Sequence, residues 1–444
     1  MKKAFLSILL TTLAVTMVSA QAIVNVPAAT DTTQADNRLD VGVQLLTQGE
    51  IRQGGLTKGG SSEDEVHFIV GRTRFNIGYQ RKSLETKLVL QNTAVWGMDK
   101  SMDVKLYEAW AKLKAPCGLF MQVGRQVLSY DDERIIGPND WATVSNSHDI
   151  LRLGYEGYGH KAHAVLAYNQ NADAPDGGGT FYDNNTQYKA LQLLWYHYDL
   201  PRLPLGASVL FMNIGMQGGA KDKNEHIEWQ QLLGGYLSFT PPFGSLEASY
   251  YHQFSKNESG IIMDGWMAAV KAQAQPWKFL GFTAGFDYLS GDEYFPVPAS
   301  PGQPLVATRH HVNQGFSPVY GSHVKFYGAM DFFYVSAYLN TFTPGLQNTY
   351  FGVNANPFKS LNLGLTYHYM ATATKLSGLG MTLGHELEFS FSYQFAKDIQ
   401  LSGGLSFMKG SDTMERLKLS TEKGQLLWGW LTLVIDPKLF TLKW

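Results

Sequence analysis

Residues 66–80 read VHFIVGRTRFNIGYQ, and apolar and polar side chains alternate along most of them. Residues 84–91 and 104–114 alternate in the same way. Because a β-strand has a side-chain period of two, each stretch predicts a strand with one apolar and one charged face. In a soluble sandwich the apolar face would meet a second sheet. In a membrane barrel it faces lipid, and the polar face lines a lumen.

The connections between such stretches distinguish the two architectures. Tight turns rich in Pro and Gly are predicted at 80–83, 115–118, 157–160, 201–204, 240–244 and 276–278. Longer polar stretches lie between them, at 52–65, 97–103, 129–147, 171–186 and 216–227. Short periplasmic turns that alternate with long extracellular loops are typical of outer-membrane barrels. A sandwich shows no such strict alternation.

Strand-like segments recur along the whole chain. Eighteen are predicted, at 39–51, 66–80, 84–96, 104–114, 118–128, 148–157, 160–170, 187–199, 205–215, 228–240, 244–255, 261–274, 278–290, 346–356, 360–372, 383–396, 399–409 and 424–435. The fold class is therefore all-β, a transmembrane antiparallel β-barrel of about 18 strands, within a range of roughly 16–20. Segment 330–342 is placed within a long loop, 291–345. A barrel of this size leaves a water-filled channel.

The first residues predict export from the cytoplasm. Lys2 and Lys3 precede a mostly apolar stretch, Ala4–Val18, and Val18-Ser19-Ala20 has the small-residue pattern of a cleavage site. We expect a signal peptide at 1–20, cleaved after Ala20, and a barrel in the cell outer membrane. A short periplasmic segment, 21–38, would precede the barrel at 39–444. The alternative, a retained anchor, is disfavoured because the apolar stretch is too short to span a bilayer.

Composition narrows the class of protein. Aromatic residues make up 13% of the chain and charged residues only 17%, below the roughly 25% of soluble domains. The formal charge is −2, and removal of Lys2 and Lys3 leaves 34 basic against 38 acidic side chains. This balance does not predict nucleic-acid binding. Cys117 is the single cysteine, so no intramolecular disulfide is possible.

The end of the chain carries a second barrel signal. Phe440, Leu442 and Trp444 alternate toward a terminal aromatic residue, which resembles the C-terminal assembly signal of bacterial barrels. Asp436-Pro437 interrupts this run, and proline cannot donate to a strand ladder. Residues 437–444 are therefore either a strand or a tail.

Two stretches carry a family resemblance. The first holds Glu108-Ala109, Gly124-Arg125-Gln126, Tyr130, Arg134, Gly137, Trp141, Asp149 and Arg152, and the second holds His323, Phe326, Gly328, Asp331, Phe333 and Gly345-Leu346. Together they resemble the alginate-export porin family. The resemblance implies an eighteen-stranded, monomeric barrel with loops folded over the pore and a basic lumen that passes anionic sugar polymers. The chain departs from the family at His148, where an aromatic residue is usual.

Strand parity selects the candidate pore-lining and substrate-binding residues. Those predicted to face the lumen are Arg72, Arg74, Glu85, Lys87, Glu108, Lys112 and Arg152. Arginine and lysine in such positions select anions. Alternation places Arg125 on the lipid side, but the family resemblance implies an inward position, and we include it. Arg134 is included in a loop that would fold inward and narrow the pore.

Catalytic and metal-binding interpretations have little support in the sequence. Ser145, His148 and Asp149 are close in sequence, but a triad needs aligned geometry and an oxyanion site. The pairs His160/His163 and His310/His311 lack a third ligand at suitable spacing. We therefore predict no enzymatic activity, cofactor or metal. Six tryptophans near strand ends predict interfacial girdles more strongly than a sugar-stacking path: Trp96, Trp195, Trp229, Trp266, Trp277 and Trp428.

Two functions remain open from the sequence. The first is a porin-like channel for diffusion or export of small polar or anionic solutes, with acidic saccharides as a candidate class. The second is a barrel plugged by 291–345 that acts as a surface binding or structural protein. Both have outer-membrane lipid as a partner, neither involves nucleic acid, and the family resemblance favours a monomer.

Overall fold

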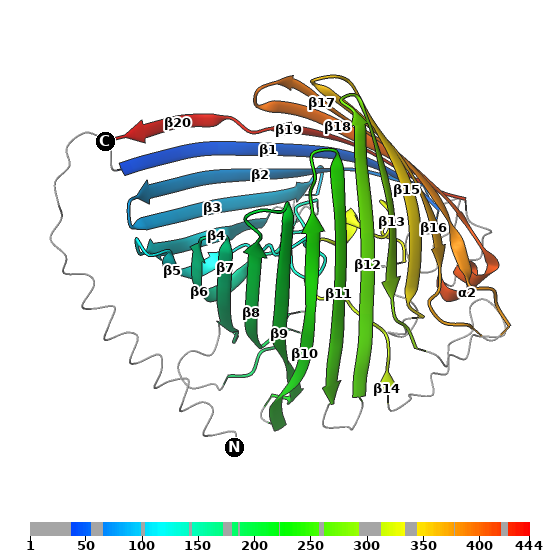
Figure 1. Cartoon of the computed structure of the whole chain (residues 1–444), viewed down its shortest axis with the longest axis horizontal. Coiled ribbons are helices and arrows are strands. Elements are labelled where there is room, and N and C mark those ends of the chain that lie inside the picture. Colours follow the sequence, from blue (N-terminus) through cyan, green and yellow to red (C-terminus); the bar gives the residue numbers. More distant parts are fainter. Residues whose placement is uncertain are drawn as a thin grey trace.

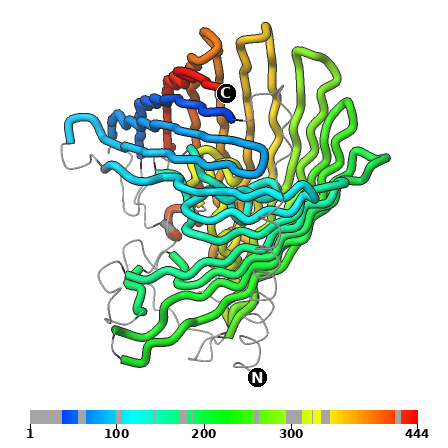
Figure 2. The backbone as a smooth tube through the Cα atoms, turned by 90° about the vertical axis from the view of Figure 1, so that its left-hand side faces the viewer, coloured from blue at the N-terminus to red at the C-terminus, as the bar shows by residue number. Residues whose placement is uncertain are grey.

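The strands of this chain close into a single barrel (Figures 1 and 2). The computed structural model describes residues 37–54, 65–98, 103–141, 144–171, 180–184, 187–221, 223–256, 262–292, 312–333, 344–376, 378–418 and 425–444. The expected signal peptide and residues 21–36 lie outside this part of the chain. The first strand begins at Asn37, two residues before the predicted start of the barrel.

The wall consists of eighteen strands, in which each strand pairs with the next and β19 pairs with β1. They are β1 (Asn37–Gln53), β2 (Glu65–Arg81), β3 (Leu84–Val95), β4 (Asp103–Lys114), β5 (Leu119–Gln126), β6 (His148–Gly157), β7 (His160–Tyr168), β8 (Ala190–Asp199), β9 (Leu205–Ala220), β10 (Lys223–Phe239), β11 (Gly244–Lys256), β12 (Ile262–Trp277), β13 (Leu280–Leu289), β15 (Leu346–Phe358), β16 (Leu361–Ala371), β17 (Thr382–Ala396), β18 (Ile399–Gly410) and β19 (Gln425–Ile435). Every pairing within this wall is antiparallel. The predicted fold class and strand number are confirmed.

Side chains alternate between the two faces of the wall as the sequence predicts. On β19, Leu431 and Leu433 are exposed on the outer face, whereas Thr432 between them is buried and donates to Gln48 Oε1 at 2.9 Å. An apolar outer face is stable only against lipid or another apolar surface. Within the described residues, no helix is long and apolar enough to span a membrane.

The two ends of the barrel differ in their connections. At the short-turn end, two to five residues join the strands, for example at 82–83, 158–159 and 240–243. Exposed aromatic side chains gather near this end: Phe243, Trp277, Phe279, Phe358 and Phe395. Such residues suit a membrane interface, where an aromatic ring contacts both lipid and water.

Longer connections lie at the opposite, long-loop end, with one exception. Residues 216–227 were predicted to form a long loop, but β9 and β10 extend through nearly all of it. The prediction is wrong because polarity on both faces does not exclude a strand. A hairpin that extends beyond the apolar wall can be polar on both faces and still keep its ladder.

The chain ends as a strand and not as a tail. Beyond Pro437, β20 (Lys438–Lys443) continues along β1 after a bulge between Val41 and Gly42. Asn37 and Trp444 exchange backbone hydrogen bonds of 3.0 and 3.1 Å. Pro437 therefore lies in the break between β19 and β20, where its missing N–H costs no ladder hydrogen bond.

Two segments fold into the barrel. We call residues 127–141 and 144–147 the first inner loop and residues 312–333 the second inner loop. The second includes β14 (Val312–Asn313) and a short 3₁₀ helix, η2 (His323–Lys325). The two inner loops contact each other through a bridge between Ile136 and Tyr320. The predicted placement of 330–342 in a loop agrees with the turn at 330–333, and the remainder lies outside the described residues. A helix, α2 (Asp412–Lys418), lies between β18 and β19.

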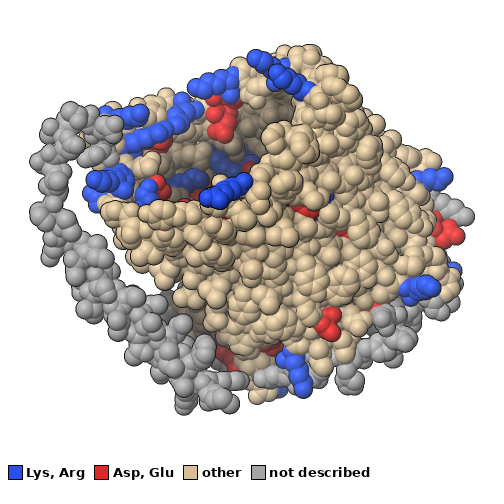
Figure 3. Space-filling model, viewed as in Figure 1, with Lys and Arg blue, Asp and Glu red and all other residues tan. Residues whose placement is uncertain are grey.

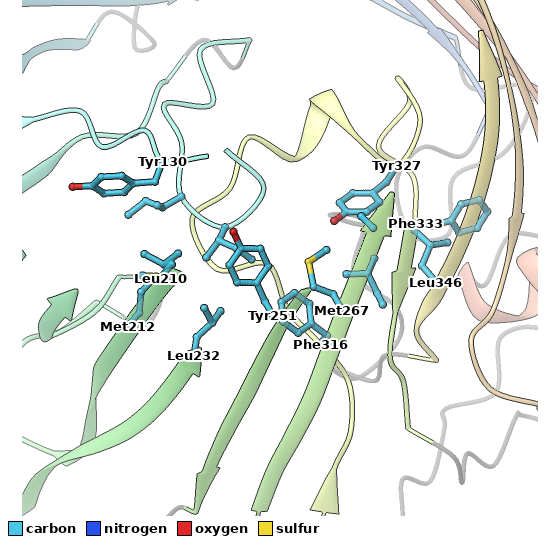
Figure 4. Packing of buried hydrophobic residues seen from close by; sticks show 14 of the residues in the cluster. Tyr130, Leu210, Met212, Leu232, Tyr251, Met267, Phe316, Tyr327, Phe333 and Leu346 are labelled. Carbon is cyan, nitrogen blue, oxygen red and sulfur yellow. The ribbon is translucent and has the colours of Figure 1, made fainter. Parts of the chain in front are cut away.

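The barrel interior holds a hydrophobic core around these loops. Figure 4 shows wall residues Leu210, Met212, Tyr251 and Met267 pointing toward loop residues that include Tyr130, Phe316 and Tyr327. The lumen-facing positions of β8 and β9 are apolar because they pack against the inner loops and not against water. This explains why those two strands lack the polar face that β2 and β3 show.

Candidate functional site

The first inner loop crosses the lumen from one wall to the other. Asp131 accepts hydrogen bonds from Trp195 Nε1 at 2.9 Å, Ser208 Oγ at 2.5 Å and Tyr251 Oη at 3.0 Å, on β8, β9 and β11. Asp140, near the other end of the loop, binds β2. In a ring of eighteen strands, β2 and β11 lie on opposite sides. A loop that reaches both must run inside the barrel.

Two arginines on β2 hold the loop to the wall. Arg72 Nη1 lies 3.2 Å and Arg74 Nη2 lies 2.7 Å from Asp140 Oδ1. Arg74 also donates to Ser145 Oγ at 2.8 Å and stacks on the Tyr107 ring at 4.1 Å. Burial alone would raise the pKa of Asp140, but the two guanidinium groups outweigh it and lower that pKa below its ordinary value. Asp140 therefore stays ionised at neutral pH.

This direction gives a pH prediction. A carboxyl whose pKa is lowered on folding contributes stability above its unfolded pKa, and this contribution is lost as the pH falls through the folded pKa. We expect the first inner loop to stay bound to β2 from about pH 8 to about pH 5, because Asp140 titrates below its ordinary value of about 3.9. Limited proteolysis of the refolded protein across this range, with Asp140→Asn as the comparison, measures release of the loop. Release of the loop near pH 6 in the native chain would contradict the prediction.

A buried arginine joins both inner loops to the opposite wall. Arg134 has a side chain 2% exposed and lies 3.0 Å from Asp287 Oδ1 on β13 and 3.1 Å from Asp132 Oδ2. It donates to Tyr327 Oη at 3.3 Å and stacks on the Phe326 ring, both in the second inner loop. Burial lowers the pKa of Arg134, but Asp287, Tyr327 and Asp132 together raise it well above its ordinary value. The guanidinium stays charged and ties the three elements together.

Two glutamates on β17 anchor the second inner loop. Glu386 Oε1 accepts the Met330 backbone N–H at 2.9 Å, and Glu388 accepts that of Ala329. Gly328, just before them, has φ +88°, and a Cβ there would lie 2.3 Å from Glu386 Oε2. Glycine is therefore required at this close approach.

The accessible cations lie elsewhere on the lumen wall. Lys112 Nζ lies 3.8 Å and Arg152 Cζ lies 5.6 Å from the centre of the Phe120 ring, so both cations contact one aromatic ring. We call Lys112 and Arg152 the cation pair. Arg152 donates to Gln122 at 2.5 Å. Figure 3 shows that the short-turn end of the barrel is hollowed, and that lysine and arginine side chains surround the hollow, with fewer acidic ones.

Acidic residues accompany the lysines on β3 and β4. Lys87 Nζ lies 2.6 Å from Glu108 Oε1, and Lys114 Nζ lies 2.5 Å from Glu85 Oε1. The Lys87 side chain remains 41% exposed. These pairs place both signs of charge along one wall, and paired charges at an exposed surface contribute little to stability.

Three of the nine candidate residues hold the inner loops and do not line the pore. Arg72, Arg74 and Arg134 are buried in these contacts and almost completely shielded from solvent in the lumen. Their partners are distant in sequence, and parity alone gives no sign of them. Glu85, Lys87, Glu108, Lys112 and Arg152 lie on the lumen face, although Glu108 is itself buried against Lys87 and Trp110.

The inward position of Arg125 is wrong. Arg125 pairs in register with Ala109 and shares the outer face with Val123, which is exposed. It forms a two-pronged ion pair with Asp149 on β6, at 2.9 and 2.5 Å. Strict alternation therefore holds on β5, and a neighbouring carboxylate stabilises the arginine at its outer position.

Two of the six tryptophans are not interfacial. Trp195 and Trp428 are buried in the lumen, and each donates its Nε1–H to a carboxylate, Asp131 or Glu50. Trp96, Trp266 and Trp277 are exposed on the outer face, as predicted. An indole N–H close to a strand end finds either water or a carboxylate, and the sequence does not show which.

Sequence reasoning missed the wall carboxylates that bind the inner loops: Asp287, Glu386 and Glu388. The available signal was two acidic residues at alternate positions of one strand, 386 and 388, on the face opposite Leu387. Within the described residues, no group of three or more His, Cys, Asp or Glu side chains is placed to hold a metal ion.

Several solved structures share this architecture, among them a porin. OpdO of Pseudomonas aeruginosa is 12% identical, with TM-score 0.60, over 90% of this chain and 98% of that one. OccK2 (OpdF) of the same organism, in complex with glucuronate, is 11% identical, with TM-score 0.58, over 90% and 97%. A BenF-like porin from Pseudomonas fluorescens is 11% identical, with TM-score 0.58, over 90% and 99%. The fold is that of a porin.

At these identities the likeness concerns the fold and not the cargo. No protein-family model matches the chain, and no curated protein matches it.

Proposed function

We propose that this protein is an outer-membrane channel for small polar or anionic solutes. The observation that carries the proposal is the cation pair, Lys112 and Arg152, on the lumen wall of an eighteen-strand barrel whose inner loops narrow the passage. Cations in a narrow, low-dielectric passage attract anions and raise their local concentration. One barrel supplies the whole pathway, so a single chain in outer-membrane lipid is the proposed functional unit.

Carboxylate-bearing sugars are the proposed cargo class. Two independent similarities support this class. The chain resembles the alginate-export porins at residues that include Tyr130, Arg152 and Gly328, and OccK2, which shares the fold, has been solved with glucuronate. A carboxylate would interact with Lys112 and Arg152.

Single-channel recording tests the proposal. We expect mature protein refolded into a planar bilayer to give discrete open steps, with a reversal potential under a salt gradient that shows anion preference. Added glucuronate should reduce the current in a concentration-dependent way. A folded barrel by circular dichroism that leaves the bilayer sealed would contradict the channel.

A plugged surface protein is the second candidate. It is favoured by the hydrophobic core that the inner loops share with β8, β9, β11 and β12, because such a core excludes water from that half of the lumen. The sealed-bilayer result would support it, and the long-loop end would then be the working surface.

A further inference from the structure

A recess of about 680 Å³ lies on the lumen face near the short-turn end. One side is formed by β1–β4, through residues that include Gly42, Gly78, Lys87 and Trp110. The other side is formed by the corner between β19 and β20 and by the β17–β18 turn, 397–398. The recess is separate from the cation pair on Phe120, since neither Lys112 nor Arg152 lines it.

Backbone forms the floor of the recess. A Cβ added at Gly78 would have no heavy atom within 4 Å, and one added at Gly42 would lie 3.4 Å from Pro437 O. Gly78 therefore opens onto free space inside the barrel, and this space is what a ligand would occupy.

The lining carries nearly balanced charge. Four carboxylates and three ammonium groups contribute to it: Asp40, Glu85, Asp398 and Asp436, with Lys87, Lys397 and Lys438. Asp40 is already saturated by Arg38, Lys438 and Thr441, at 2.7, 3.2 and 2.6 Å. Lys87 on one side can still serve a ligand, because its ammonium group has three N–H donors and Glu108, at 2.6 Å, takes one of them. Asp436, Asp398 and the exposed Lys397 border the other side.

These groups have different positions relative to the apolar surface. Lys87 stands beside Trp110, whose Nε1–H is taken by Glu108 at 2.8 Å, so that the indole offers the recess only its ring surface. Asp436 accepts one hydrogen bond, from Gln44 at 3.1 Å, and is exposed. A cation, a flat ring and a carboxylate thus border one space.

We propose that this recess binds small zwitterions, which hold their carboxylate toward Lys87 and their ammonium group toward Asp436 and Asp398. The proposal rests on the channel function, as a site where such solutes pause at the short-turn end. A simple anion would gain Lys87 but would also meet the carboxylates of Asp436 and Asp398, whereas a zwitterion satisfies both signs. The cation pair, in contrast, favours any solute with a carboxylate, whether or not the solute also carries an ammonium group.

Binding of 6-aminohexanoate tests the proposal, with hexanoate and hexylamine as probes of one charge each. Titration calorimetry on the full chain in detergent is expected to give an affinity for 6-aminohexanoate about tenfold above that for either comparison compound. Gly78→Phe fills the recess and should abolish this binding. Gly49→Phe is the matched control, because Gly49 lies on the outer face of β1 and also has nothing within 4 Å of an added Cβ; it should leave binding unchanged.

A second variant tests the proposal even if the Gly78→Phe variant fails to fold. Asp436→Asn takes away one carboxylate of the ammonium side and should reduce the affinity for 6-aminohexanoate toward that for hexanoate. Equal binding of all three compounds by the native chain, or zwitterion binding that survives both variants, overturns the proposal. Conductance is recorded in parallel. Binding without open steps would refute the channel function and support the recess as a binding site. Open steps without binding would support the channel function and refute the recess as a binding site.

Discussion

Arg134→Met is expected to destabilise the barrel interior and to give a larger, noisier conductance. The substitution leaves Asp287, with a side chain 1% exposed, without its cation. Removal of one partner from a buried ion pair costs about 3–5 kcal/mol, because the remaining charge stays desolvated. The same change removes the contacts to Asp132 and Tyr327, so both inner loops lose their link to β13. Thermal unfolding and single-channel recording measure the two effects.

A paired variant separates charge from packing in this experiment. Arg134→Met combined with Asp287→Asn removes the orphaned carboxylate and should recover part of the lost stability, while the loops remain released. If the Arg134→Met variant has the same unfolding temperature and the same conductance as the native chain, Arg134 does not hold the inner loops.

Lys112→Gln with Arg152→Gln is expected to abolish the anion preference of the channel. These side chains are the cations that contact Phe120 on the lumen wall. Their loss leaves Glu156 and the ion pair of Glu85 with Lys114 as the nearby charges. Charge along the narrow part of a pore sets its selectivity, so the ratio of anion to cation permeability should fall to about one or below. The reversal potential under a salt gradient measures this ratio directly.

The control for this double variant is Arg125→Gln. It removes one positive charge where the double variant removes two, and Arg125 lies on the outer face, beside Asp149. Its reversal potential should equal that of the native chain. A double variant with unaltered selectivity would show that ions pass by another route and that the cation pair lies outside it.

The two inner loops also explain how a wide barrel becomes a narrow passage. Their contacts reach β2, β11, β13 and β17, so that the lumen is divided by well-packed protein and not merely covered at one end. An ordered constriction keeps its charged groups in fixed positions, which selectivity requires. In the proposed channel, the solute pathway would follow the wall of β3–β6, where the cation pair lies.

The sequence by itself determined the barrel. Side-chain alternation in stretches such as 66–80 and 84–91 is a property of neighbouring residues, so it requires no knowledge of the rest of the chain. Turn residues such as Pro and Gly also marked most strand ends, because a turn depends only on the few residues that form it. Parity then placed Lys87, Lys112 and Arg152 on the lumen face.

Only the tertiary structure decided which lumen residues are available to a solute. Arg72 meets Asp140 across 68 positions, and Arg134 meets Asp287 across 153. Such pairs form when a loop crosses a closed barrel, and no local pattern encodes the crossing. The same holds for Trp195 and Trp428, whose N–H groups find buried carboxylates. Periodicity fixes the face on which a side chain lies, because that is local geometry; burial and partnership depend on what the fold brings to that face.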